Sequence, residues 1–159
     1  MRPEPKEQID PRALPVWRWE GAIGSLVSAV VVGALQYLAL RFSWAWWIPA
    51  LAWMLLLLEV VCLVIWFPKV RWLRWRFEIR EEEIDLQRGI IFRTRTLIPM
   101  VRIQHVDTNQ GPVMRKYGLS SVTFSTAAGS HEIPALSNEM ADQVRDQIAE
   151  LARVSHEDV

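Results

Sequence analysis

Two long apolar runs constrain this chain more than any other feature. Residues 21–40 contain no charged side chain, and twenty helical residues at about 1.5 Å each span roughly 30 Å, the thickness of a hydrocarbon core. A second run, from Trp44 to Phe67, carries one charge, Glu59. Lipid offers no partner to exposed backbone N–H and C=O groups, so both runs are predicted to be membrane-crossing helices. The tripeptide 41–43 between them predicts an antiparallel hairpin.

The overall composition excludes several functions. The 18 basic and 18 acidic side chains lack the basic excess of a typical nucleic-acid binder, so no nucleic-acid partner is expected. All nine tryptophans lie between Trp17 and Trp75, as expected for indole rings at membrane boundaries. The single cysteine, Cys62, lies in the second run and cannot form a disulfide within the chain. With no metal-ligand spacing and no Gly-rich phosphate loop, we expect no cofactor and no metal site.

Composition also predicts how the chain is divided. Residues 1–16, rich in proline and charge, are expected to form a disordered tail. Residues 17–75 form the transmembrane hairpin with basic and aromatic flanks, residues 76–154 a soluble domain, and residues 155–159 a second tail. Lys and Arg are frequent at both outer ends of the hairpin, whereas its loop holds only Arg41. The positive-inside rule therefore predicts that both termini are cytoplasmic. Because the two runs cross the membrane, the lipid bilayer is itself an expected partner.

Polar and small residues inside the runs predict how the two helices pack. Small residues recur at spacings of three and four from Gly21 to Gly33, which lets a neighbouring backbone approach closely. The neighbour is either the second helix or another copy of the chain, and the second helix is favoured because it is tethered alongside. Glu59 lies about 12 Å from the cytoplasmic end of its helix and Ser28 about 10 Å from the matching end of the first. We therefore predict that Ser28 is the partner of Glu59. The alternative is a transport or enzyme role for Glu59, for which a lone carboxylate on two helices provides no pathway.

The segment KVRWLRWR after the second run alternates cations with tryptophans. Such a stretch is attracted to anionic headgroups by about 1 kcal/mol per basic residue, and its indoles prefer the boundary layer. Plain positive-inside flanking is a compatible interpretation. The residues predicted to lie at the membrane surface are Lys69, Arg71, Trp72, Arg74, Trp75 and Arg76.

From Phe77 the apolar residues alternate with period two, which predicts antiparallel strands. Strands are expected up to Arg88, over Ile90–Ile98 and over residues 101–110, where a slip in register suggests a bulge. Later strands flank a turn at residues 127–130. A final helix, capped by Ser137 or Asn138, carries Met140, Val144, Ile148 and Leu151 at helical spacing. The predicted fold is a membrane α-hairpin plus an antiparallel β barrel or sandwich capped by a C-terminal helix.

Short motifs across the soluble domain resemble the bacterial pleckstrin-homology-like (bPH2) membrane protein family. They are Ile98-Pro99, residues 101–106, residues 109–112 with Arg115, residues 117–119, residues 125–127 and residues 133–136. The resemblance implies a pleckstrin-homology (PH) fold of seven strands and a C-terminal helix at the inner face of the plasma membrane. It also implies that a homo-oligomer, or a complex with another PH-like membrane protein, is a plausible assembly.

The motif residues are interpreted as parts of the fold, and no catalytic residue is assigned. His105 beside Asp107 lacks a nucleophile for acid-base chemistry. The first hairpin turn, which is basic in phosphoinositide-binding relatives, is here Glu81-Glu82-Glu83 and would repel an inositol phosphate. The motif residues assigned a structural role are Pro99, Arg102, Gln104, His105, Gln110, Gly111, Pro112, Arg115, Gly118 and Leu119.

Three functions remain open from sequence. The leading hypothesis is a non-enzymatic module that mediates protein–protein assembly at the cytoplasmic face of the membrane. The alternative is binding or sensing of anionic lipid headgroups by the basic segment, with Arg93 and Arg95 as further cations. The third is the transport or enzyme role of Glu59, which full function of a Glu59→Gln variant would dismiss.

Overall fold

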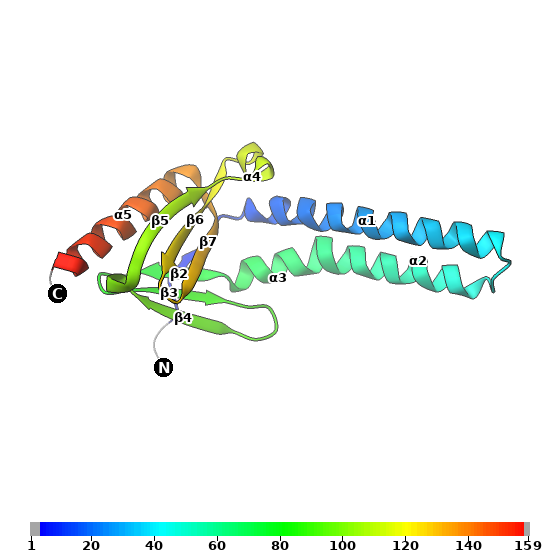
Figure 1. Ribbon diagram of the computed structural model, residues 1–159, viewed down its shortest axis with the longest axis horizontal. Helices are drawn as coiled ribbons and strands as arrows, with labels where there is room; N and C mark the ends of the chain where they lie inside the picture. The colour runs from blue at the N-terminus through cyan, green and yellow to red at the C-terminus, as the bar shows by residue number, and fades with distance from the viewer. Residues whose placement is uncertain (1–3, 158–159) are drawn as a thin grey trace. The chain divides into compact units, whose positions relative to one another are not determined.

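The computed structural model describes residues 4–157, and the chain divides into two compact units. One unit is the segment Leu14–Val70; the other joins residues up to Ala13 with those from Arg71 onward. The first unit is built on α1 (Ala13–Arg41) and a second long helix (Figure 1). That second helix runs from Trp47 to Arg74 as α2 (Trp47–Val60), the π-helical turn η1 (Val61–Trp66) and α3 (Phe67–Arg74).

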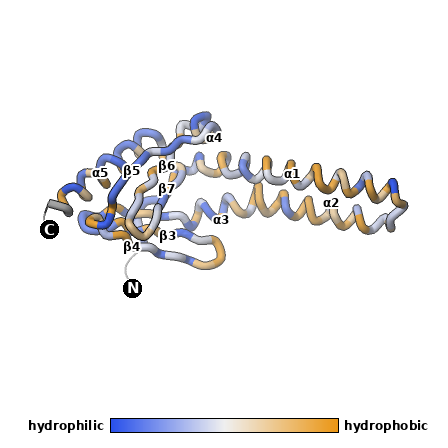
Figure 2. Tube along the Cα trace, viewed as in Figure 1, coloured by the Kyte–Doolittle hydropathy of each residue, from blue (hydrophilic) through white to orange (hydrophobic). Residues whose placement is uncertain are grey.

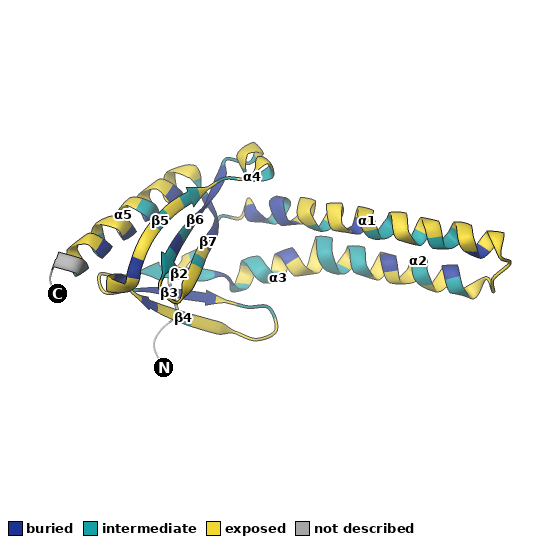
Figure 3. Ribbon diagram, in the orientation of Figure 1, coloured by how far each residue is buried: buried dark blue, intermediate teal, exposed yellow. Residues whose placement is uncertain are grey.

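The long helices are apolar on the outside. Figure 2 shows hydrophobic residues along most of α1 and α2, and Figure 3 shows that much of the same surface is exposed. In the most apolar 18-residue stretch of each helix only 11% is buried, so neither is the core helix of a soluble domain. Val30, Leu40 and Leu57 are each about two-thirds exposed or more. The two predicted spans are therefore confirmed as helices, and their surface matches lipid and not water.

Of the three glycines in α1, only Gly21 lies against the backbone of the second long helix. A Cβ atom added at Gly21 would lie 2.6 Å from the Leu63 carbonyl oxygen, which is a close approach of two backbones. Gly24 and Gly33 have nothing within 4 Å of the same position. The predicted close approach of the second helix is thus found at Gly21 and not at the other two glycines.

The second unit contains two antiparallel sheets of short strands. In the order β1-β2-β3-β4, the first sheet contains β1 (Glu7–Gln8), β2 (Arg76–Ile79), β3 (Glu83–Arg88) and β4 (Thr94–Pro99). The second contains β5 (Ile103–Asn109), β6 (Leu119–Thr126) and β7 (Gly129–Ser137). The turn η2 (Met100–Arg102) joins the sheets, and α4 (Pro112–Lys116) joins β5 to β6. The seven strands agree with the PH fold implied by the resemblance, and the sheets do not close into a barrel.

Several local predictions are confirmed by the strands and turns. The register of β5 against β6 shifts between Ile103 and His105, where the sequence predicts a slip. Gly118, which was assigned a structural role, follows α4 with a φ of 65°, the left-handed conformation that ends a helix. The strand expected over Ile90–Ile98 is wrong in its first half, because β4 begins only at Thr94 and residues 89–93 form a loop.

The N-terminal segment is folded where a disordered tail was expected. β1 pairs with β2, placing Glu7 opposite Phe77, and Ile9 is 1% exposed. The Trp72 indole N–H donates to the Ile9 carbonyl at 3.1 Å, and the Gln8 amide donates to the Trp72 carbonyl at 3.0 Å. Tertiary contacts therefore order residues that local composition leaves unstructured; Met1–Pro3 lie outside the described residues.

The C-terminal helix α5 (Asn138–Glu157) packs on β5, β6 and β7. The Ser137 hydroxyl accepts the Met140 backbone N–H at 3.2 Å, which confirms the predicted cap. Val144 and Ile148 are buried as expected, but Met140 is 41% exposed. Ala141 and Ala152 extend the buried stripe instead, and the helix continues through residues 155–157, which were expected to be tail. Residues 158–159 of that tail are outside the described range.

His131 makes the stability of this unit depend on pH. It lies opposite Phe124 across β6 and β7, with the two ring centroids 5.8 Å apart, and its Nδ1 is buried without a hydrogen-bond partner in the described chain. Burial, and then the positive charge of Arg88, lowers the pKa of His131 below its ordinary 6.5. As pH falls from 6.5, the unfolded chain takes up a proton that the folded chain refuses, so stability is lost.

We therefore expect the thermal midpoint of the wild type to fall more than that of a His131→Phe variant between about pH 7.5 and about pH 5.5. Phenylalanine keeps the ring beside Phe124 but cannot titrate, so the difference between the two proteins isolates this one group. Parallel curves for the two proteins over that range would contradict the assignment.

Candidate functional site

The basic segment after the second span is only partly available to lipid. Lys69 is exposed, but Trp75 is 5% exposed and belongs to the core. The Arg74 guanidinium donates to the Ile90 carbonyl, and the Trp72 indole is bound to the Ile9 carbonyl. Placing Trp75 at the membrane surface is therefore wrong, because its indole is enclosed by protein. Arg71 and Arg76 are half-buried.

The two further cations proposed for headgroup binding face carboxylates. The Arg95 guanidinium lies 2.5 Å from an oxygen of Asp85, whose side chain is fully buried. That hydrogen bond raises the pKa of Arg95. Arg93 lies 3.3 Å from Glu4 on the surface. Both cations thus form ion pairs with carboxylates of the protein, which disfavours a role for them in binding lipid headgroups.

The membrane pair predicted from helix geometry is present. The Ser28 hydroxyl donates to Oε1 of Glu59 at 2.8 Å, and both side chains are partly buried. The carboxyl group therefore has a partner between the helices and does not face lipid alone.

Gln110 and its neighbours fasten the start of α5. The Gln110 amide donates to the Leu119 carbonyl at 2.9 Å and to the Asn138 side chain at 3.0 Å. The Ser120 hydroxyl donates to the same Asn138 oxygen at 2.8 Å. Gly111 precedes α4, and Leu119 is fully buried. These contacts give Gln110, Gly111 and Leu119 roles in the fold.

The remaining motif residues do not converge on one site. Pro99 ends β4, Arg102 lies in η2, and Gln104 and His105 lie on β5. Pro112 begins α4 and Arg115 lies in its last turn. Among the described residues no group of three His, Cys, Asp or Glu side chains has the geometry to hold a metal ion.

A groove of about 430 Å³ runs beside β5 where α5 packs against it. β5 is an edge strand of its sheet: it pairs with β6 on one side, and no strand of the described chain pairs with its other side. Gln104 and Ala149 are exposed at the groove, whereas Ala152 is 7% exposed. Its lining residues are Ile103, Gln104, Val106, Ala149, Ala152 and Arg153.

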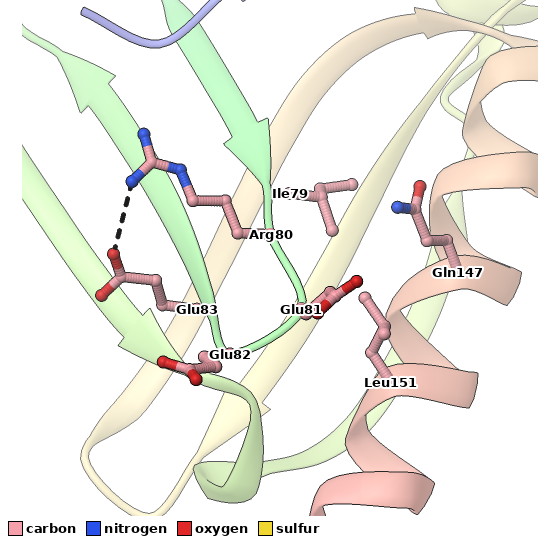
Figure 4. Close-up of a pocket in the computed structure, with 7 residues that line it drawn as sticks. All are labelled: Ile79, Arg80, Glu81, Glu82, Glu83, Gln147 and Leu151. Atoms are coloured by element: carbon pink, nitrogen blue, oxygen red, sulfur yellow. Dashed lines mark ion pairs between the residues drawn. The ribbon is translucent and has the colours of Figure 1, made fainter. Parts of the chain in front are cut away.

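A second hollow, of about 670 Å³, lies between the β2–β3 turn and α5 (Figure 4). Glu81, Glu82 and Glu83 line it, and its one cation, Arg80, is bound to Glu78 at 2.7 Å and lies 3.6 Å from Glu83. The hydrogen bond with Glu78 raises the pKa of Arg80. Figure 4 shows the Glu81 side chain beside Leu151 of α5. The excess of carboxylates makes this hollow unsuited to phosphate groups.

Sequence reasoning missed two surface features. The groove escaped it because Ala149 and Ala152 are small residues without a chemical signature, and only the packing of α5 on β5 places them beside a terminal strand. The loop at Ile91 and Phe92, which are 79% and 83% exposed, has the composition of a strand. The charged Arg88 and Gly89 before it were the available signal for a turn.

Two antiparallel sheets, a C-terminal helix and a pair of long apolar helices inserted between the first two strands define a transmembrane protein with a PH-like domain. The chain belongs to the Bacterial PH domain family, bPH_2, whose sequence model matches residues 13–152 and so covers the helices and most of the domain.

Two relatives come from Bacillus subtilis (strain 168). The chain is 48% identical over 159 residues to the UPF0699 transmembrane protein YdbS, covering all of both chains. It is 26% identical over 83 residues to the UPF0699 transmembrane protein YdbT, covering 50% of this chain and 17% of that protein. No solved structure matches the chain.

Proposed function

We propose that this protein is a membrane-anchored, non-enzymatic PH-like module that binds an extended segment of another protein at the cytoplasmic face of the plasma membrane. The observation that carries the proposal is the groove between β5 and α5. A terminal strand beside a groove suits the addition of a partner strand, in which main-chain hydrogen bonds give affinity and the groove selects side chains.

Charge and position support the same proposal. The excess of Lys and Arg at the outer ends of the spans favours a cytoplasmic domain. Internal contacts of Trp72, Arg74 and Trp75 leave the basic segment less able to act as a headgroup reader. Glu59, hydrogen-bonded to Ser28, supports helix packing more than transport or catalysis. The partner is a second copy of this chain or another PH-like membrane protein.

The test fills the groove without touching the core. Ala149→Trp places an indole in the groove from an exposed position, and Gln143→Trp places the same indole on an exposed part of α5 that does not line it. A photo-crosslinking amino acid at Gln104 in the full-length protein should capture a reproducible partner or a second copy in native membranes. We expect Ala149→Trp to reduce that product about tenfold, a loss of about 1.4 kcal/mol, and Gln143→Trp to leave it unchanged.

Equal reduction by both tryptophans would point to a general disturbance of α5. No crosslinked product from wild-type membranes, together with a strictly monomeric protein after detergent extraction, would contradict the proposed function.

A further inference from the structure

The loop between β3 and β4 carries the most exposed large apolar side chains of its unit. Ile91 is 79% exposed and Phe92 is 83% exposed, although neither belongs to the membrane-spanning helices. In Figure 2 this loop is hydrophobic at its tip, and in Figure 1 it projects beyond the end of the strands that it joins. Two adjacent large apolar side chains held in water are unfavourable, which indicates a partner surface.

The topology of the first sheet places this loop beside the start of β2 and the end of α3. β2 begins at Arg76, two residues after the end of α3, and Arg76 pairs with Gln87 near the end of β3. Since β3 runs antiparallel to β2, it returns to the point where β2 began. The Arg74 guanidinium donates to the Ile90 carbonyl and fastens the loop to that point. The β2–β3 turn, with Glu82, lies at the opposite end of the same strands.

The loop has a defined conformation that presents its apolar residues outward. Gly89 has a φ of 121°, which side chains rarely adopt, and an added Cβ would meet the Phe92 carbonyl oxygen. The exposed Arg88 precedes the tip, whereas Arg93, which follows it, is paired with Glu4 at 3.3 Å. An apolar tip beside an exposed cation suits the boundary between anionic headgroups and acyl chains.

We propose that Ile91 and Phe92 insert into the headgroup and acyl-chain boundary of the membrane that the two spans cross. Arg74 follows Phe67, the end of the apolar run, by seven positions, about 10 Å along a helix, which keeps the loop within reach of the interface. The loop is then a third attachment of the domain to the bilayer. It fixes the rotation of the domain about its tether, independently of any partner bound at β5.

Depth measurements on the full-length protein test this insertion. Cys62 is the single cysteine and is replaced by alanine. An environment-sensitive fluorophore is then attached at Phe92→Cys, at Ile91→Cys or, as the matched control, at Glu82→Cys. Each protein is reconstituted in vesicles of phosphatidylglycerol and phosphatidylethanolamine, with and without bromine on the acyl chains. We expect blue-shifted emission and strong bromine quenching at 91 and 92, corresponding to a depth of about 5 to 10 Å, and neither effect at 82.

Two results would overturn the proposal. Labels at 91 and 92 that remain as accessible to water as the label at 82 would show that the loop stays outside the bilayer. A blue shift at 91 and 92 without bromine quenching would show that protein, not lipid, covers the tip. Because the two positions are tested separately, the conclusion does not depend on the folding of one variant.

Discussion

An Ile9→Ala variant is expected to lower the free energy of unfolding of the PH-like unit by about 2 to 5 kcal/mol, the usual effect of removing a buried isoleucine side chain. Ile9 lies in a segment whose composition is that of a disordered tail, yet its side chain is 1% exposed. Truncation leaves a cavity at a fully buried position, so the loss includes both transfer and cavity contributions.

The same segment is held at several other points. The Asp10 backbone N–H donates to the Ala135 carbonyl at 3.1 Å, and the Arg12 guanidinium donates to the Tyr117 carbonyl at 3.3 Å. The carboxyl of Asp10, hydrogen-bonded by Arg12, has a lowered pKa. These contacts leave the segment little room to relax around a cavity at Ile9, which favours the upper part of the expected range.

Thermal unfolding of the full-length protein in detergent micelles measures the effect. A loss of about 2 kcal/mol should lower the midpoint by at least about 8 °C in a unit of this size. Lys6→Ala, at an exposed position of the same segment, is the control and should change the stability by less than about 0.5 kcal/mol. If Ile9→Ala behaves like Lys6→Ala, the segment contributes nothing to the core.

The contrast between Ile9 and the Ser28–Glu59 pair shows which features sequence can predict. The pair was predictable because a helix has a fixed rise per residue, and a short loop sets two antiparallel helices side by side. β1 contains two residues and has no periodicity to detect. Its conformation is set by the edge of β2 and by Trp72, which lies 63 positions further along the chain than Ile9.

The strands show the same difference between features set by local sequence and features set by tertiary contacts. Alternation of apolar and polar residues in the sequence located β3 and β6, whereas the boundary of β4 was misplaced because Ile90 and Ile91 have strand propensity but occupy a loop. The groove at β5 depends on the docking of α5 across distant sequence and carries no local pattern. The acidic β2–β3 turn, by contrast, could be recognised in the sequence from its three consecutive glutamates, and it lines the carboxylate-rich hollow.

The second large effect is expected at Gly21, where α1 lies close to the backbone of η1. A Cβ there would lie 2.6 Å from the Leu63 carbonyl oxygen and 3.0 Å from its carbon, well inside ordinary contact distance. A Gly21→Leu side chain must therefore push the helices apart. Ser28 lies seven positions further on, about 10 Å along α1, so its 2.8 Å hydrogen bond to Glu59 is stretched by the same movement.

Loss of that hydrogen bond leaves a carboxyl group without a partner in hydrocarbon, which costs several kcal/mol. Gly21→Leu should therefore unfold at a clearly lower fraction of sodium dodecyl sulfate than the wild type, when helicity is followed in mixed micelles. Gly24→Leu and Gly33→Leu are matched controls, since nothing lies within 4 Å of either added Cβ. Leucine exceeds glycine in helix propensity by up to about 1 kcal/mol, so the controls should be unchanged or slightly more resistant. An effect of opposite sign at Gly21 thus separates helix packing from propensity, and the same shift at all three glycines would rule out the close approach as its cause.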